Sequence, residues 1–392
     1  MRKKVLAVLM ALVALCAFAV AEETAEDWVK TGDELYENGF YEDAAQAWDN
    51  ALQLYNKAIE QNPKDDAKAW MDKGSVLFKL ALSKGNDSLF EESIESYDRA
   101  LEIDPNLADA WYGKSIVLHN QLNRDNEALE TLDKALQIDP TNPIYWEGKG
   151  RILFIPGRYN DSIEAFNKAI EFWPANRTYE LSVTWWLKGT ILLEAGRPED
   201  AVNAFNESLQ LNPNQTDVWI AKGDAFIAMG NYSESLESYE KAIQMDPGSA
   251  GAWESKGNVL NSLGRPEDAV KAYENAIELY DNFTYYGWTA KARILQEMNK
   301  YDDALKAYDN AIEFAHSGYP IEAAAAWIKK ADIFYKMGEY DEAIEEYDKA
   351  IELVPLYADP WYRKGTALKA LGHHDESDAA FAKATELGYK EM

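Results

Sequence analysis

The strongest constraint on the fold is a spacing of 34 residues that recurs along the chain. Trp219 has one tryptophan 34 residues before it and another 34 residues after it, and the glycine at position 223 recurs with the same spacing. A fixed period of this length is typical of repeat arrays, in which each unit packs on the next along one direction. The sequence therefore predicts one array, rather than the two or three globular domains that 392 residues would otherwise suggest.

Ten copies of the unit align on one tryptophan each. The residue four positions after each tryptophan is Gly, Ala or Ser, and the residue three positions further on is Leu or Phe. Spacings of three and four place residues on one face of a helix, and a small residue on that face lets a partner helix approach closely. The ten marker tryptophans are Trp28, Trp70, Trp111, Trp146, Trp185, Trp219, Trp253, Trp288, Trp327 and Trp361.

A second amphipathic helix follows in each unit after a turn that often contains glycine. Its buried face alternates small, aromatic and small residues, as in Ala201, Phe205 and Ser208. Acidic residues in its first turn suit the helix dipole. Proline, which lacks the donor that a continued helix needs, ends seven of the ten second helices: Pro63, Pro105, Pro140, Pro174, Pro213, Pro247 and Pro355.

These two patterns closely resemble the tetratricopeptide repeat (TPR) family over nearly the whole chain after residue 21. The resemblance implies an all-α, right-handed superhelical α-solenoid of antiparallel helix pairs. The first helix of each pair would line the concave face and the second the convex face. The ten repeats are predicted near residues 25–66, 67–107, 108–142, 143–181, 182–215, 216–249, 250–284, 285–323, 324–357 and 358–391.

Four insertions break the 34-residue register. We expect Leu54–Glu60 to extend a helix by two turns and Ser83–Ser88 to form a polar insert in a turn. Extra residues between repeats are expected near Ala175–Ser182 and Ser317–Glu322. Repeat 10 carries Asp378 and Thr385 where most repeats have apolar residues. A solenoid needs a polar end to stay soluble, so this repeat is expected to act as a cap that ends the array.

Residues 1–21 have the features of a secretory signal. A basic segment at residues 2–4 precedes the apolar run Val5–Val20, and Ala19–Ala21 forms a small-x-small cleavage site. The sequence thus predicts an exported protein, extracellular or at the cell surface, with no integral membrane span after cleavage. An uncleaved N-terminal helix that tethers the chain to a membrane is the alternative, and lipidation of Cys16 is a further one.

Seven N-x-S/T sequons support export. In an exported protein such sites are candidates for glycosylation on an exposed surface. Asn206 is predicted to lie in the middle of a helix and is the weakest of them. The glycosylation candidates are Asn86, Asn160, Asn176, Asn214, Asn231 and Asn282.

The charge and cysteine content argue against several classes of function. The chain has 39 Lys and Arg against 68 Asp and Glu, a net charge of −29, with no clustered basic run after the leader. Binding to nucleic acid needs such clusters to release counterions, so no nucleic-acid partner is predicted. The acidity favours solubility, with a cationic partner as the alternative. The single cysteine lies in the leader, so the mature chain would have no disulfide.

No catalytic or cofactor motif stands out. The sequence has no glycine-rich phosphate loop, nucleophile elbow or His-Glu zinc helix. The run His373–Glu376 contains possible metal ligands, but neighbours on a turn rarely converge on one ion, and a catalytic zinc needs three protein ligands. We therefore predict no enzymatic activity, no cofactor and no bound metal.

By the geometry that the TPR resemblance implies, residues one, five and eight positions after each marker tryptophan face the concave groove. Some family members bind chaperone C-termini through a carboxylate clamp, with Lys at the first position and Asn at the second. Here no Lys occupies the first position and only Asn258 matches the second, so no such chaperone partner is expected. Arg151 and Arg293 have no like-charged cluster around them, which disfavours a dedicated anion site.

Apolar and aromatic residues at the groove positions are the binding candidates. Aromatic side chains offer large contact areas at interfaces, although several could instead be partly buried between neighbouring helices. We interpret the chain as an exported scaffold that binds an unknown protein or peptide. A structural or cell-envelope component acting by self-assembly is the alternative, and an enzyme or a glycan binder is less favoured. The candidates are Tyr36, Phe78, Tyr112, Phe154, Trp186, Ile220, Tyr335 and Tyr362.

Overall fold

The computed structural model describes residues 23–62, 66–120, 124–155, 157–279, 284–315 and 318–390. The predicted signal at residues 1–21 and the sequon at Asn282 lie outside this part of the chain. The chain divides into two compact units, residues 1–184 and 185–392, and each is described by itself. All regular structure in the described residues is helical, which confirms the all-α fold class.

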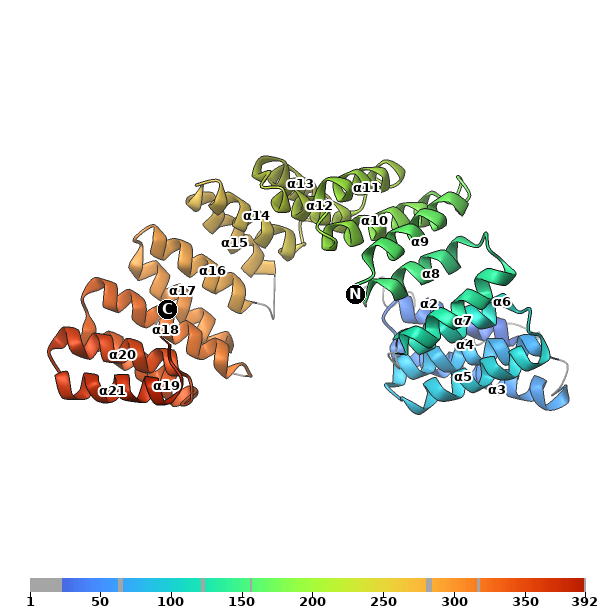
Figure 1. Ribbon diagram of the computed structural model, residues 1–392, viewed down its shortest axis with the longest axis horizontal. Coiled ribbons are helices and arrows are strands. Elements are labelled where there is room, and N and C mark those ends of the chain that lie inside the picture. Colours follow the sequence, from blue (N-terminus) through green and yellow to red (C-terminus); the bar gives the residue numbers. More distant parts are fainter. Residues whose placement is uncertain are drawn as a thin grey trace, which may run out of the picture. The chain divides into compact units, whose positions relative to one another are not determined.

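Unit 1 is a stack of antiparallel helix pairs in which each helix packs on the next one along the chain (Figure 1). Contacts between α4 and α6, and between α6 and α8, bring the first helices of neighbouring pairs together. The helices are α2 (Ala25–Glu37), α3 (Tyr41–Gln61), α4 (Ala67–Lys84), α5 (Ser88–Ile103), α6 (Ala108–Asn120), α7 (Asp125–Ile138), α8 (Pro143–Phe154) and α9 (Tyr159–Phe172).

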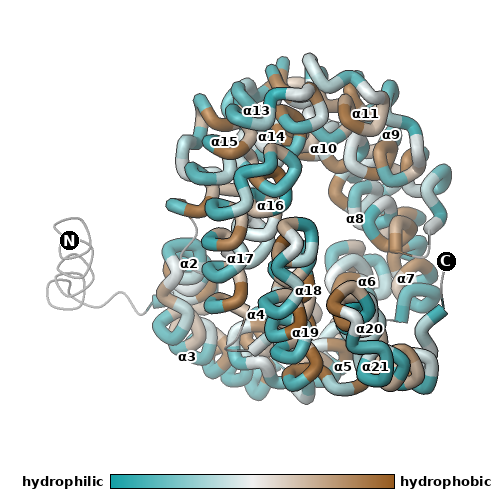
Figure 2. The backbone as a smooth tube through the Cα atoms, turned by 90° about the vertical axis from the view of Figure 1, so that its left-hand side faces the viewer, coloured by the Kyte–Doolittle hydropathy of each residue, from teal (hydrophilic) through white to brown (hydrophobic). Residues whose placement is uncertain are grey.

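Helix α10 (Thr178–Glu194) contains the boundary between the units, and unit 2 continues with the same arrangement of pairs. Figure 2 shows hydrophobic and hydrophilic segments alternating along its helices, as expected for amphipathic helices. They are α11 (Pro198–Leu211), α12 (Thr216–Ala228), α13 (Tyr232–Met245), α14 (Ala250–Ser262), α15 (Pro266–Leu279), α16 (Thr284–Glu297), α17 (Tyr301–Ala315), α18 (Pro320–Met337), α19 (Tyr340–Leu353), α20 (Ala358–Leu371) and α21 (His374–Glu386).

The two helices of a pair meet where the small residue of the first helix faces the aromatic residue of the second. A Cβ atom added to Gly150 would lie 2.5 Å from the ring of Phe166, and one added to Gly223 would lie 2.7 Å from the ring of Tyr239. Both rings are fully buried. In these two repeats the glycine therefore lets the helices approach closely, because an added Cβ atom would collide with the ring where the helices now lie.

In the described part of the chain, four of the marker tryptophans join their helix pair to the preceding one by a hydrogen bond, whereas the Nε1 atoms of Trp70, Trp219 and Trp288 have no partner. The indole Nε1–H of Trp111 donates to the carbonyl oxygen of Pro105 at 2.9 Å, and that of Trp146 donates to Pro140 at 2.8 Å. Trp253 and Trp361 make the equivalent bonds to the prolines six residues before them. The tryptophan thus satisfies a carbonyl group in the loop that the proline creates when it ends the preceding helix.

A lysine three residues after the marker tryptophan forms a second link between repeats. It reaches back to a carboxylate on the preceding second helix, as in Lys114–Asp98 at 2.6 Å and Lys256–Glu240 at 3.0 Å. Four further pairs repeat this link: Lys149–Asp133, Lys291–Glu274, Lys330–Asp309 and Lys364–Asp348. These lysines are largely buried, so the pairs lie in surroundings where charge interactions are stronger than at the open surface.

Lys222 lacks this partner because the equivalent position on α11 is Asn206. Among the described residues it makes no ion pair, and its ammonium group lies 4.8 Å from the centroid of the Trp219 ring. Burial lowers the pKa of Lys222 below its ordinary value. The folded state therefore holds a partly desolvated cation without an ion-pair partner among the described residues, whose lowered pKa the carboxylate of Glu237 offsets only in part.

The insertions differ from expectation at three of four places. Leu54–Glu60 lies within the long helix α3, as predicted. The insert Ser83–Ser88 is a turn only from Gly85 to Asp87, because α4 continues to Lys84 and α5 begins at Ser88. The residues expected between repeats near 175–182 and 317–322 are partly helical, since α10 begins at Thr178 and α18 at Pro320. Added residues therefore lengthen a helix, which is the second helix of the pair in α3 and the first helix in α4, α10 and α18, and they can form backbone hydrogen bonds there.

In repeat 10, Asp378 and Thr385 are both exposed on α21, where no described helix packs against them. Tyr389, which follows α21, stacks on Tyr362 of the same repeat with ring centroids 4.2 Å apart. The outer face of this helix pair is therefore polar within the described residues.

Replacing Asn206 with Asp should stabilise unit 2 by up to about 1 kcal/mol, because the new carboxylate can pair with Lys222 and raise its pKa. The pair requires an ionised aspartate, so the gain should be present at pH 7 and lost as the pH falls below about 4. Urea unfolding of N206D, K222M and the double variant at pH 7 and at a pH below about 4 measures the coupling free energy between the two side chains. A gain in N206D that persists in the K222M background would show that the pair is not its cause.

Candidate functional site

The described part of unit 2 contains a cavity of about 850 Å³ on the side of the first helices. Its walls come from α14, α16, α18 and α20, and the second helix α17 contributes Tyr308. Six lining residues occupy the positions one, five and eight residues after the marker tryptophans: Glu254, Thr289, Arg293, Gln296, Asp332 and Tyr335. The cavity is therefore a hollow in the concave groove of repeats 7 to 10.

Sequence reasoning missed the other side chains that shape this cavity. Tyr285, Tyr286 and Tyr308 line it, and they lie outside the three groove positions. Lys329, Lys336 and Arg363 also line it, at two or nine residues after a marker tryptophan. The stacking of first helices thus places cations from three helices in the wall of one cavity, together with the carboxylates of Glu254, Glu297 and Asp332.

A repeated hydrogen bond connects the core of each pair to the groove. Where the second helix carries tyrosine, its ring packs on the small residue of the first helix and its hydroxyl group can emerge on the groove side. The hydroxyl of Tyr273 donates to Oδ1 of Asn258 at 2.6 Å, and that of Tyr239 donates to Asp224. In both cases the acceptor lies fifteen residues earlier, at the second groove position of the same repeat.

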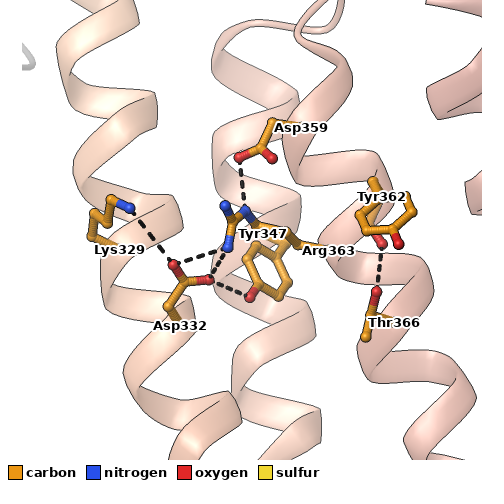
Figure 3. Close-up of polar contacts among 7 residues, drawn as sticks. All are labelled: Lys329, Asp332, Tyr347, Asp359, Tyr362, Arg363 and Thr366. Atoms are coloured by element: carbon orange, nitrogen blue, oxygen red, sulfur yellow. Dashed lines mark hydrogen bonds and ion pairs between the residues drawn. The ribbon is translucent and has the colours of Figure 1, made fainter. Parts of the chain in front are cut away.

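Repeat 9 elaborates this bond into a network (Figure 3). The hydroxyl of Tyr347 donates to Asp332 at 2.8 Å, and Arg363 of the next repeat donates to the same carboxylate at 3.0 Å. Lys329 lies 4.0 Å from Asp332, and Asp359 accepts from Arg363 at 2.7 Å. Burial alone would lower the pKa of Arg363, but its bonds to Asp359 and Asp332 raise it, so this arginine stays charged.

Repeat 8 departs from the pattern because Arg293 occupies the acceptor position. The residue fifteen positions later is Tyr308, whose ring is buried and whose side chain lines the cavity. An arginine has no acceptor atom, so it cannot receive the tyrosine proton. Among the described residues Tyr308 makes no hydrogen bond, and Arg293 is exposed without an ion-pair partner. Burial raises the pKa of Tyr308 to about 12, so the phenol stays protonated at neutral pH.

The predicted groove candidates are spread over both units. In unit 1, Tyr36 is 41% exposed and lies 5.0 Å from the ring of Tyr41, while Tyr112 is half-buried against Tyr145 at 5.2 Å. Phe78 and Phe154 are also half-buried and contact aromatic residues of the following helix. In unit 2, Trp186, Ile220, Tyr335 and Tyr362 are half-buried, and of these Tyr335 lines the cavity.

A cavity of about 780 Å³ lies in unit 1, between α2, the extended end of α3, and α4. Lys68 bridges two of the carboxylates in its wall, Glu26 at 3.2 Å and Asp72 at 3.4 Å. Burial raises the pKa of Asp72 above its usual value. The polar groups of this cavity are thus largely matched with one another, in contrast to Arg293 and Tyr308 in unit 2.

The sequons differ in exposure. Asn86, Asn160, Asn176, Asn214 and Asn231 are exposed, whereas Asn206 is half-buried within α11 and the hydroxyl-bearing Ser208 of its sequon is fully buried. In the described part of the chain, no helix has the length and apolar content needed to cross a membrane. Across the same residues, no three metal-ligating side chains gather at one point.

Family models of the tetratricopeptide repeat match most of the chain. Models described as "Tetratricopeptide repeat" match residues 29–106 and 220–282, residues 88–152 and 192–237, and residues 285–315 and 358–387. A model described as "TPR repeat" matches residues 331–372. The chain belongs to the tetratricopeptide repeat family. This TPR protein therefore carries its groove on a fold whose units are helix pairs, as the marker residues predicted.

Comparison with curated proteins finds a partial similarity. Protein O-mannosyl-transferase TMTC3 of Homo sapiens is 39% identical over 79 residues, which are 20% of this chain and 8% of that protein. The chain thus matches only about 8% of the length of this relative.

Among solved structures, one TPR protein shares the fold and a second is reported as a weaker similarity. The C-terminal part of a TPR repeat-containing protein from Cytophaga hutchinsonii is 18% identical, covers 62% of this chain and 95% of its own, and gives a TM-score of 0.53. YrrB, described as a TPR protein with an unusual peptide-binding site, is 21% identical, covers 53% of this chain and 99% of its own, and gives a TM-score of 0.41.

Replacing Asp332 with Ala should destabilise repeats 9 and 10 by about 1 to 3 kcal/mol, because Tyr347 loses its acceptor and Arg363 loses one of its two partners. Amide hydrogen exchange in α19 and α20 should become faster, while exchange in α2 to α8 stays unchanged. Asp378→Ala, which removes an exposed carboxylate from α21, is the control. Equal exchange in D332A and the unsubstituted protein would show that the network contributes no stability.

Proposed function

We propose that this TPR protein is an exported scaffold that binds peptides or proteins in its concave groove, with the unit 2 cavity as the principal site. The observation that carries this proposal is the gathering of four tyrosines with cationic and amide side chains around 850 Å³. No catalytic step is assigned to it.

The chemistry of the cavity supports a peptide ligand. Binding sites of several hundred Å³ commonly combine aromatic walls with a few polar groups that fix orientation. Tyr286 is 54% exposed at the rim, and Tyr335 supplies a second aromatic surface on the next first helix. Both stand on helices held by neighbouring repeats, so the surface requires little ordering when a ligand binds, which favours affinity.

Replacing Tyr286 with Ala should weaken the binding of peptides selected on the full chain from a displayed random library by about tenfold or more. The ring is exposed in the free protein and would be covered by the ligand, so its loss removes contact area without removing core packing. Fluorescence anisotropy of the labelled peptides measures the affinity, and circular dichroism checks helicity.

Tyr179→Ala is the matched control, because Tyr179 is 67% exposed in unit 1 and lies outside the described cavities. Affinity lost equally in both variants would place the peptide elsewhere. Failure of the full chain to select any peptide would count against the binding function itself.

Export rests on the predicted signal and the sequons. Expressed in cells that secrete and N-glycosylate proteins, the chain should appear in the medium with its N-terminus at residue 22. Glycans should occur at exposed sequons such as Asn160 and Asn231 and be absent from Asn206, whose partner Ser208 is buried. Peptide mapping by mass spectrometry measures both features. Retention of residues 1–21 on a membrane would support the tethered alternative instead.

Self-assembly is the second candidate, because apolar side chains stand exposed at the same end of neighbouring helix pairs in unit 2. Tyr319 and Ile321 are each 65% exposed at the start of α18, and Leu356 is 79% exposed just before α20. Exposed apolar patches of this kind are a feature of association surfaces. A molar mass that stays monomeric over a hundredfold range of concentration in light scattering would rule this candidate out.

A further inference from the structure

We infer that the cavity of unit 1 binds an organic ligand through a primary ammonium group, which Tyr55, Asp72 and Glu26 contact. This cavity lies between α2, the extended end of α3, and α4. The inference stands apart from the proposed function, because it concerns a second cavity with a ligand of its own.

The insertion in repeat 1 builds one wall of this cavity. Helix α3 has 21 residues, whereas α7, the second helix of repeat 3, has 14. Tyr55 lies in the added segment Leu54–Glu60, and Leu54, Lys57 and Ala58 of the same segment also line the cavity. The added residues thus give repeat 1 a hollow between its own first helix and that of repeat 2.

Most polar groups of this wall are matched, and Tyr55 is the exception. The residue is only 6% exposed, and its hydroxyl makes no hydrogen bond among the described residues. Buried polar groups normally have a partner. Burial raises the pKa of Tyr55, and the carboxylates of Asp72 and Glu26 raise it further, so the phenol stays protonated and lies on the side of these two residues.

The hydroxyl of Tyr55 lies where two cavities meet. A second cavity of about 490 Å³ borders the first, and the two share Glu26, Tyr55, Lys68 and Asp72 as lining residues. A phenol oxygen has lone pairs that accept from an N–H donor. A ligand that enters this place can therefore donate to Tyr55 and to the neighbouring carboxylates together.

Lys68 shows which kind of group these carboxylates accept. Its ammonium nitrogen lies 3.2 Å from Oε1 of Glu26 and 3.4 Å from Oδ2 of Asp72. One lysine thus serves two carboxylates, which leaves one negative charge over. Asp72 is the less solvated of the two, and burial raises its pKa in spite of Lys68. A second ammonium group would compensate the charge that remains.

The surrounding charges steer a cation to this place. The wall of the unit 2 cavity has more basic than acidic residues, so acidity is not common to all cavities of this acidic chain. Among the acidic residues of unit 1, Asp33 is held by Lys79 and Glu34 lies 3.9 Å from Lys30. The described walls of the two unit 1 cavities contain Lys30, Lys57 and Lys68 against Glu23, Glu26, Asp33, Glu34, Glu37, Asp66 and Asp72.

The geometry favours an ammonium group over a metal ion. Glu26 and Asp72 share the Lys68 nitrogen at hydrogen-bond distances, whereas oxygen ligands of calcium lie about 2.3–2.6 Å from the ion. Trp28 and Leu54 are half-buried in the same wall and offer apolar area for the carbon chain of a ligand. The face of an indole ring also attracts a cation.

A lysine side chain of a protein and a free polyamine both present a primary ammonium group, and the experiment distinguishes them. Isothermal titration calorimetry of the full chain at physiological ionic strength uses three probes. The first is an N-acetylated and C-amidated decapeptide of Gly and Ser with three central lysines, the second is the same peptide with acetylated lysines, and the third is spermidine. The lysine peptide or spermidine should bind about tenfold or more tightly than the acetylated peptide, and the one that does identifies the source.

Tyr55→Phe tests the site without changing the charge of the protein. It removes a hydroxyl that has no partner in the free protein, so thermal stability should be retained while affinity for the binding probe falls about tenfold. Asp72→Asn should weaken binding by about tenfold or more. Asp378→Asn, which makes the same change of charge at an exposed residue of α21, is the matched control and should leave binding unchanged.

Tyr286→Ala in the unit 2 cavity should also leave this binding unchanged, which separates the inference from the proposed function. Circular dichroism confirms that each variant is folded. The inference would be overturned if neither the lysine peptide nor spermidine bound more tightly than the acetylated peptide. Equal weakening by Asp72→Asn and Asp378→Asn would also overturn it, because binding would then follow the net charge. Unchanged affinity in Tyr55→Phe would show that the phenol does not contact the ligand and would overturn it as well.

Discussion

The fold depends on the contact between a small residue of each first helix and an aromatic ring of the second. At Gly150 and Gly223 even one added methyl carbon would collide with that ring. The small residue lets the two helices approach closely, so the ring is fully buried between them. The next pair then packs against this pair. In several repeats the marker tryptophan and the lysine three residues after it bind a pair to the one before, through a proline carbonyl and a carboxylate.

The same contact links the core to the groove. A tyrosine ring that is fixed on the small residue brings its hydroxyl group to the concave side, where the second groove position must satisfy it. Asp224, Asn258 and Asp332 do so, whereas Arg293 does not. Repeat 8 thus departs from a hydrogen bond that repeats 6, 7 and 9 share.

The period and the helical spacing were enough to predict the fold, since every repeat shows the small residue and the tryptophan. The insertions were harder, because α10 and α18 begin early with residues that the sequence pattern assigned to loops. The cavity was missed for a different reason. Lys329 and Lys336 lie off the groove positions in sequence, and only the stacking of helices brings them near Arg293. The fifteen-residue offset from Arg293 to Tyr308 was visible in the sequence, but its meaning required the hydrogen bonds of the other repeats.

The most direct test of this account is an experimental structure of the full chain with a bound peptide that was selected on it from a random library. The account predicts that the peptide lies in the unit 2 cavity, with its backbone beside Tyr286. A peptide that binds outside this cavity would contradict it.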